Sequence, residues 1–391
     1  MSGIRVRRGT KAAVRQMYTM VLCVSGPDDG PELGAALAAF VSRWTGPADG
    51  EHDAPSLAVG PLVTPAGSFL LLDVGKLSET RRAALVDELV RELEDAGVVE
   101  AEISGPPGSR LWPAELAGSA HLSVAMGRDW GPSCYAVVYP GPRGYGTSGH
   151  TPLPTAWIDI AITWMNGFGH HDATVILEGA IDLDVPLLDL ADLMKAGLDT
   201  TIVAIVGDPR TFAAAVGINP FDRTLSLAVG GTDLSAGDAE TALGSLTALA
   251  GSLEGAVYGI AGFDHRWTSL VRGYHVPPEQ QRTDGERSTE SFPFIQPTTI
   301  ARFVDEVAVD AAPWQLLTTG HIERLGNAPE GATPLDEGRW QLLIGTAEQW
   351  WPNNEPAPML SQARSAIRTL LLTKKEANEY GLARYARRHE N

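Results

Sequence analysis

Basic residues, cysteines and long apolar runs are all scarce in this sequence. The chain has 391 residues, with 30 Lys and Arg against 48 Asp and Glu, which gives a formal net charge of −18. Duplex DNA is bound by basic surfaces that neutralise phosphates, so this balance argues against nucleic-acid binding and favours a basic partner. Hydrophobic residues make up 44% of the chain, which is typical of folded domains and excludes a disordered chain.

The two cysteines, Cys23 and Cys134, lie far apart. They form neither the paired spacing of a zinc site nor the dense pattern of a secreted disulfide scaffold, so we expect a cytoplasmic protein. No apolar run approaches the roughly 20 residues that cross a bilayer. The short apolar run at 17–24 follows several arginines but lacks a signal-peptide cleavage site, so it predicts a first strand. We therefore expect no membrane partner.

Residues 1–105 have the element order of a ferredoxin-like unit. Alternation and helical spacing predict strands at 17–24, 56–63, 69–74 and 98–103, with helices at 31–44 and 78–96. This β-α-β-β-α-β order places two helices on one face of an antiparallel sheet.

The rest of the chain divides into a strand-rich middle segment, 106–220, and a second ferredoxin-like unit with insertions and a C-terminal helix, 221–391. In the middle segment we predict strands at 121–126, 134–139, 157–164, 173–177 and 200–206, and a helix at 186–196. In the last segment we predict strands at 224–229, 256–260, 314–317 and 340–344, and helices at 237–252, from 300 and at 358–387. The fold class is therefore α/β (α+β), with tandem ferredoxin-like units whose antiparallel sheets are covered by helices.

No motif in the chain fixes a reaction or a cofactor, and we expect no cofactor. The run Gly146-Thr-Ser148-Gly-His150 lacks the last glycine of a nucleophile elbow, and no phosphate-binding P-loop is present. His170 and His171 are adjacent, so in a strand they would point to opposite faces and could not share one metal ion.

A metal-assisted hydrolase remains as an alternative, with its site in the middle segment. Glu178, Asp182 and Asp184 follow a predicted strand, and carboxylates in this pattern could hold a divalent cation. Ser148, His150 and the two adjacent histidines would supply the other polar groups. An enzyme is the less favoured reading, because such carboxylate clusters also arise by chance in an acidic chain.

Tryptophans concentrate in the last third of the chain, which holds five of the ten. The pair Trp350-Trp351 precedes Pro352-Asn-Asn-Glu, a turn composition in which indoles stand beside an acid. Exposed tryptophans are frequent anchors of protein interfaces, so this pair predicts a partner contact.

The stretch Trp314-Gln-Leu-Leu-Thr-Thr-Gly-His321-Ile-Glu-Arg-Leu-Gly326, followed by Gly338-Arg-Trp-Gln-Leu-Leu-Ile-Gly345, resembles the bacterial type VI secretion immunity-protein family. In that family a short strand leads into a helix that ends at Leu-Gly or Gly-Gly. The resemblance covers about 40 residues at the C-terminal end of the chain. It implies inhibition by tight protein binding, without catalytic residues, and adds Trp314 and His321 to the expected partner-binding residues.

The favoured hypothesis is a non-catalytic protein-binding module, such as an immunity or toxin-neutralising protein that binds a basic protein. It accounts for the acidic charge, the missing catalytic motif and the tryptophan pair together. A self-assembling structural component, whose sheet edges pair between subunits, is a further alternative. The sequence leaves the oligomeric state open.

Overall fold

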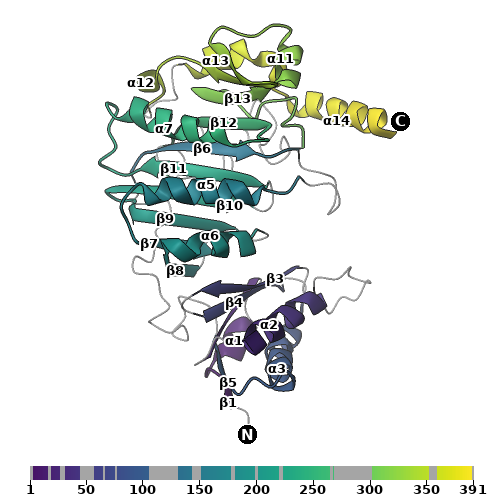
Figure 1. Cartoon of the computed structure of the whole chain (residues 1–391). Helices are drawn as coiled ribbons and strands as arrows, with labels where there is room; N and C mark the ends of the chain where they lie inside the picture. Colours follow the sequence, from purple (N-terminus) through teal and green to yellow (C-terminus); the bar gives the residue numbers. More distant parts are fainter. Residues whose placement is uncertain are drawn as a thin grey trace. The chain divides into compact units, whose positions relative to one another are not determined.

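The computed structural model describes residues 3–15, 19–26, 31–44, 57–64, 67–74, 77–104, 131–142, 151–177, 181–198, 201–219, 223–264, 267, 302–351 and 359–389. The chain divides into two compact units, residues 1–124 with 170–204 and residues 125–169 with 205–391. Helices and strands are both abundant, and the two sheets are mainly antiparallel (Figure 1). The predicted α+β class is confirmed.

The first unit contains a five-stranded sheet in the order β1-β5-β2-β4-β3. Its antiparallel strands are β2 (Thr19–Ser25), β3 (Leu57–Thr64), β4 (Gly67–Asp73) and β5 (Glu100–Ser104), with α2 (Pro31–Trp44) after β2 and α3 (Glu79–Asp95) before β5. This arrangement confirms the predicted β-α-β-β-α-β order. The short strand β1 (Gly3–Val6) pairs in parallel with β5, and α1 (Thr10–Val14) connects β1 to β2.

Alternation along these strands buries one face of the sheet. Leu22, Leu70 and Ile103 point to that face and are fully buried with Phe40 of α2 and Leu89 of α3. Burying each such side chain contributes roughly 1.5–3 kcal/mol, so this cluster holds the two helices on the sheet.

The second sheet has ten strands in the order β14-β15-β13-β12-β6-β11-β10-β9-β7-β8. They are β6 (Ser133–Tyr139), β7 (Asp172–Leu177), β8 (Ile181–Pro186), β9 (Ile202–Asp208), β10 (Phe212–Asn219), β11 (Thr224–Gly230), β12 (Tyr258–Asp264), β13 (Trp314–Thr318), β14 (Ala332–Asp336) and β15 (Arg339–Leu343). A ferredoxin-like unit needs only four strands. This sheet is larger, because β6 of the predicted middle segment pairs with both β11 and β12 of the predicted last segment. Strands from 106–220 and from 221–391 therefore share one sheet, which local sequence patterns do not reveal.

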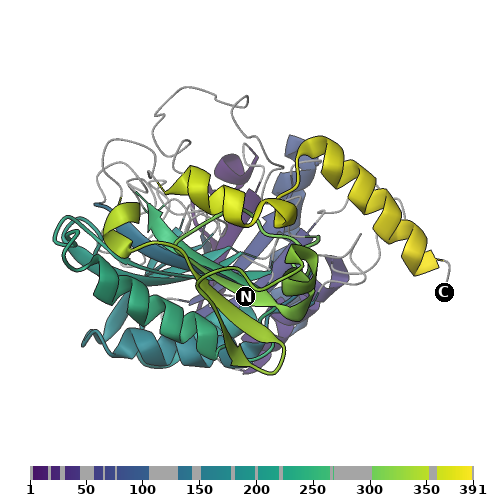
Figure 2. The same cartoon turned by 90° about the horizontal axis from the view of Figure 1, so that it is seen from above.

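Two helices of the second unit lie side by side on one face of this sheet, α5 (Thr155–Asn166) and α7 (Ala239–Ser252) (Figures 1 and 2). α7 packs on β6 and β12, and α5 packs on β10. The other helical segments are α6 (Leu187–Ala196) in the first unit and, in the second, α11 (Thr319–Leu325), α12 (Ala347–Trp350), α13 (Leu360–Ala366), the 3-10 turn η2 (Arg368–Leu370) and α14 (Lys374–His389). Among the helices that the structure describes, none combines enough length with enough apolar character to span a bilayer.

Three sequence predictions of local structure are wrong. The expected strand at 157–164 is helix α5, because its buried residues Trp157, Ile158, Ala161, Ile162 and Met165 follow helical spacing. The expected helix from residue 300 is a series of turns over 302–307. The single helix expected at 358–387 is instead divided into α13, η2 and α14.

Candidate functional site

Two of the residues expected to bind a partner are buried inside the second unit. Trp350 is 5% exposed, and its indole N–H donates to the carbonyl of Ile344 at 2.6 Å. Trp314 is 1% exposed, and its N–H donates to Oε1 of Gln341 at 3.4 Å. Both indoles have internal partners, which gives them a role in packing in this conformation.

His321 is also fully buried, near the start of α11. Its Nδ1 accepts the backbone N–H of Thr318 at 3.0 Å, so the ring proton is on Nε2, which lies 3.4 Å from the carbonyl of Val307. The ring stacks on Tyr258 with centroids 5.7 Å apart. Burial lowers the pKa of His321 to about 4, so the imidazole is neutral and caps the helix.

Trp351 is the member of the tryptophan pair that keeps an exposed part. Its ring meets Phe263 edge to face, with centroids 5.4 Å apart. The turn that follows it, 352–358, lies outside the described residues. A partner contact at Trp351 stays a prediction.

The residues of the hydrolase alternative are only partly described. Ser148, His150 and Glu178 lie outside the described residues. His170 and His171 are exposed in the turn before β7. The structure therefore gives no contact that joins them.

The two aspartates of that alternative lie on β8. Asp182 pairs with Ile176 and Asp184 with Thr174 across the β7–β8 hairpin. The exposed carboxylate of Asp184 accepts a hydrogen bond from the hydroxyl of Thr174 at 3.1 Å. Within the described ranges, no three His, Cys, Asp or Glu side chains come together as a metal site would require.

Thiol chemistry is disfavoured at both cysteines. Cys23 and Cys134 are buried and form no disulfide. Burial raises the pKa of Cys23 to about 12 and raises the pKa of Cys134 well above its usual value. Both are therefore neutral thiols at pH 7, whereas a nucleophilic cysteine acts as the thiolate.

Polar groups are also buried on the sheet face opposite α5 and α7. Tyr258 lies on this face, and its hydroxyl accepts the backbone N–H of Val309 at 3.1 Å. The next residue, Asp310, is 3% exposed and forms a bidentate ion pair with Arg364, whose Nε and Nη2 donate to the two carboxylate oxygens at 2.8 and 2.7 Å. Asp264, at the end of β12, is fully buried, and its neighbour His265 lies outside the described residues. The ion pair and the tyrosine bond hold residues 309–310 and α13 in place.

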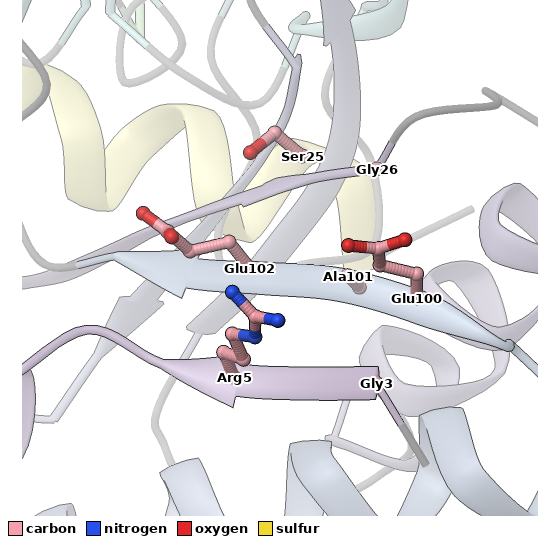
Figure 3. Close-up of a pocket in the computed structure, with 7 residues that line it drawn as sticks. All are labelled: Gly3, Arg5, Ser25, Gly26, Glu100, Ala101 and Glu102. Atoms are coloured by element: carbon pink, nitrogen blue, oxygen red, sulfur yellow. The ribbon is translucent and has the colours of Figure 1, made fainter.

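A shallow pocket of about 270 Å³ opens on the polar face of the five-stranded sheet. Figure 3 shows Arg5 of β1 between Glu100 and Glu102 of β5. Glu102 also pairs with Arg7 at 3.8 Å, and both side chains of that pair are more than a third exposed. Exposed pairs of this kind stabilise little.

A cluster of aromatic rings, partly exposed, lies at the end of α5 in the described part of the second unit. Trp164 and Phe168 meet edge to face with centroids 5.1 Å apart, and Phe168 lies 6.2 Å from Phe212 at the start of β10. Phe212 is 41% exposed, and Ile160, one helical turn before Trp164, is 36% exposed. We name these four residues the aromatic surface.

Helical spacing creates the aromatic surface. Ile160, Trp164 and Phe168 recur every four positions, so they share one side of α5 and its C-terminal turn. The N–H of Trp164 also reaches the hydroxyl of Ser245 on α7 at 3.5 Å. The rings are thus held by α5, β10 and α7 together.

The helices beside the aromatic surface contain almost no charge. The 12 residues of α5 and the 14 of α7 include two charged side chains, Asp159 and Glu240, and both are acidic. The whole chain is 20% charged, so these helices fall well below its average. A solvent-facing helix usually carries a charged outer face, so this layer has the composition of a contact surface.

The sequence reasoning missed the aromatic surface because it assigned 157–164 to a strand. In a strand, Ile160 and Trp164 share a face with Ile158 and Ile162, so no separate exposed stripe is expected. The available signal was the i, i+4, i+8 spacing of Ile160, Trp164 and Phe168, which in a helix forms a stripe separate from Ile158 and Ile162.

Comparisons with known proteins include a distant likeness to a solved structure. No protein-family model and no curated protein matches the chain. Among solved structures, a T6SS protein of Pseudomonas aeruginosa aligns with 61% of this chain and 73% of its own, at 12% identity and a TM-score of 0.38. A likeness of this degree establishes neither a common fold nor a common function.

Proposed function

We propose that this chain is a non-catalytic protein-binding module that contacts its partner through the aromatic surface. The observation that carries the proposal is the Trp164–Phe168–Phe212 cluster, in which Phe212 is exposed and the other two rings are partly exposed, beside two helices with little charge. Contiguous exposed apolar groups on a folded protein often mark interaction sites. Tryptophan and other rigid aromatics are the side chains that most often dominate binding energy at such sites.

The partner we propose is a basic protein. Asp159 and Glu240 are the charges on the two helices, and the chain as a whole carries −18. Electrostatic complementarity then favours a partner with an apolar centre and Lys or Arg around it. In its specific form the proposal is a toxin-neutralising protein that acts by tight binding.

Assembly through sheet edges is not proposed, because the described edge strands carry features that discourage pairing. β3 contains Gly60-Pro61 with a shift of register, β14 contains Pro334, and β8 ends at Pro186. β1 has four residues. Proline and shortness are common means of keeping an edge strand from pairing with another chain.

The test compares two variants in partner capture. The first, Trp164→Ala with Phe212→Ala, removes two rings of the aromatic surface. The control, Leu188→Ala, removes a side chain on α6 that is 92% exposed and lies outside that surface. Partners captured by wild type are identified by mass spectrometry, purified and titrated calorimetrically against each variant.

We expect the double variant to bind the purified partner at least about tenfold more weakly, since truncating an aromatic anchor commonly costs ~2 kcal/mol. The Leu188 control should bind like wild type, and circular dichroism should show that all variants fold. Equal affinity of the double variant and wild type would overturn the assignment of the surface. Turnover of a substrate by the chain, lost in Asp184→Asn, would overturn the non-catalytic function.

A further inference from the structure

The C-terminal helix α14 has the opposite charge to the rest of the chain. Its sequence, KKEANEYGLARYARRH, contains five Lys or Arg and two Glu, a net charge of +3 in a chain whose net charge is −18. Cations near the end of a helix suit its dipole, but that effect acts only within the last turn and does not account for Lys374 and Lys375.

The first half of α14 is fixed to the second unit. Thr373 and Glu376 form a reciprocal cap: the Thr373 N–H donates to the carboxylate at 2.7 Å, and the Glu376 N–H donates to the Thr373 hydroxyl at 3.3 Å. These bonds lower the pKa of Glu376 to about 2. Tyr380 packs edge to face on Phe303 at 5.3 Å and lies under the guanidinium of Arg324 at 4.7 Å. The direction of the helix is therefore set by this end.

The C-terminal end of α14 projects away from the rest of the second unit (Figures 1 and 2). Leu382 is 73% exposed, and Gly381 before it is a poor helix former. Most helices in proteins are stabilised by packing of an apolar face and not by propensity. An apolar side chain on a projecting cationic helix therefore fits a segment that docks on another surface.

A surface of complementary chemistry lies on the β14–β15 hairpin of the same unit. Leu335 and Leu343 are 38% and 49% exposed there. Glu330 precedes β14, and Glu337 stands in the turn; both are exposed. The hairpin thus presents apolar groups among carboxylates. Since Leu382 and the two hairpin leucines are all exposed in the single chain, they do not cover one another within one copy.

We propose that α14 of one copy docks on the β14–β15 hairpin of a second copy, so that two chains exchange their C-terminal helices. Leu382 would pack against Leu335 and Leu343, and the net positive charge of the helix would complement the hairpin carboxylates. A chain that is strongly acidic elsewhere is repelled by its own kind except where opposite charges meet. A two-fold exchange places both such contacts in one closed dimer. This contact is separate from the aromatic surface, so either proposal can hold without the other.

The test reverses the charges on each side of the proposed contact and measures the molar mass of each variant by size-exclusion chromatography coupled to light scattering. The helix variant carries Arg384→Glu, Arg387→Glu and Arg388→Glu, and the hairpin variant carries Glu330→Arg and Glu337→Arg. Each variant is run alone, and the two are then run mixed, at about 50 mM and about 500 mM salt, which brackets strong and weak screening. Leu382→Ser tests the apolar part of the contact, and Leu188→Ser is its control.

We expect wild type to be dimeric at low salt and to dissociate at high salt. The helix variant alone and Leu382→Ser should be monomeric, Leu188→Ser should remain dimeric, and the mixture of the two charge variants should contain a heterodimer. Wild type that stays monomeric at every concentration would overturn the proposal, as would a mixture that forms no heterodimer. Binding of wild type to anionic vesicles or to duplex DNA, lost in the helix variant while its oligomeric state stays that of wild type, would assign α14 to a different partner and also overturn it.

Discussion

His321 illustrates how one buried side chain links stability to pH. Its ring accepts a backbone N–H at 3.0 Å and is enclosed, so protonation inside the fold would break the cap and leave a charge without water. The resemblance that drew attention to His321 predicted a contact residue. The structure gives it the position of a capping side chain, with Tyr258 against its ring.

We expect the free energy of unfolding to fall as the pH drops below about 6.5, the usual pKa of histidine. The pKa of His321 is lowered to about 4 in the fold. The unfolded chain therefore takes up a proton first, and stability present above pH 6.5 is lost progressively towards pH 4, by ~3 kcal/mol at most from this group. Urea unfolding at several pH values measures the effect.

His321→Gln is the matched control, because Gln in the same position completes a capping box without titrating. The variant should lose much of the dependence between pH 6.5 and pH 4. An unchanged slope in the variant would show that other groups cause the loss of stability.

At the scale of elements, the sequence pattern was most informative where it is local and repeated. α2, α3, α7 and strands β2 to β5 were predicted within a few residues, because each shows a clear apolar period and a turn at its ends, whereas β1 was not predicted. α5 was misassigned because its run of apolar residues is nearly continuous. In such a run the face that points outward cannot be separated from the buried face without the helix assignment, and so the aromatic surface was missed.

The start of α3 provides a prediction at this scale. The hydroxyl of Ser78 accepts the N–H of Arg81 at 3.2 Å, which satisfies one free donor of the first turn. Ser78→Ala should lower the free energy of unfolding by ~1 kcal/mol, and Ser78→Asp should retain most of it. Chemical denaturation of the three proteins measures this. Equal losses in both variants would contradict a capping role.

The largest departure from the sequence-based picture concerns the ten-stranded sheet. Composition and local pattern located β6, β11 and β12 individually, but no local signal states that β6 lies between the other two. Such pairing is decided by tertiary packing between strands roughly a hundred residues apart in the chain, as is the pairing of β1 with β5 in the first unit. The expected partner-binding residues were also mostly misplaced by the sequence, because three of the four, Trp314, His321 and Trp350, are buried in the second unit.

At the scale of the whole molecule, the charge of −18 should determine how fast the proposed basic partner is captured. Attraction between opposite charges raises the association rate and is screened by salt, whereas apolar contacts control dissociation. Surface plasmon resonance at rising salt should therefore show a falling association rate and a nearly constant dissociation rate. A constant association rate would argue against a basic partner.

The most direct test of the central claim is oxidative footprinting of the chain with and without its captured partner. Trp164 and Trp351 are both partly exposed in the free chain, so each can be labelled and then followed by mass spectrometry. A partner bound on the aromatic surface should reduce the labelling of Trp164 and Phe212 and leave that of Trp351 unchanged. Protection of Trp351 with undiminished labelling of Trp164 would contradict the account and move the contact to the end of α12.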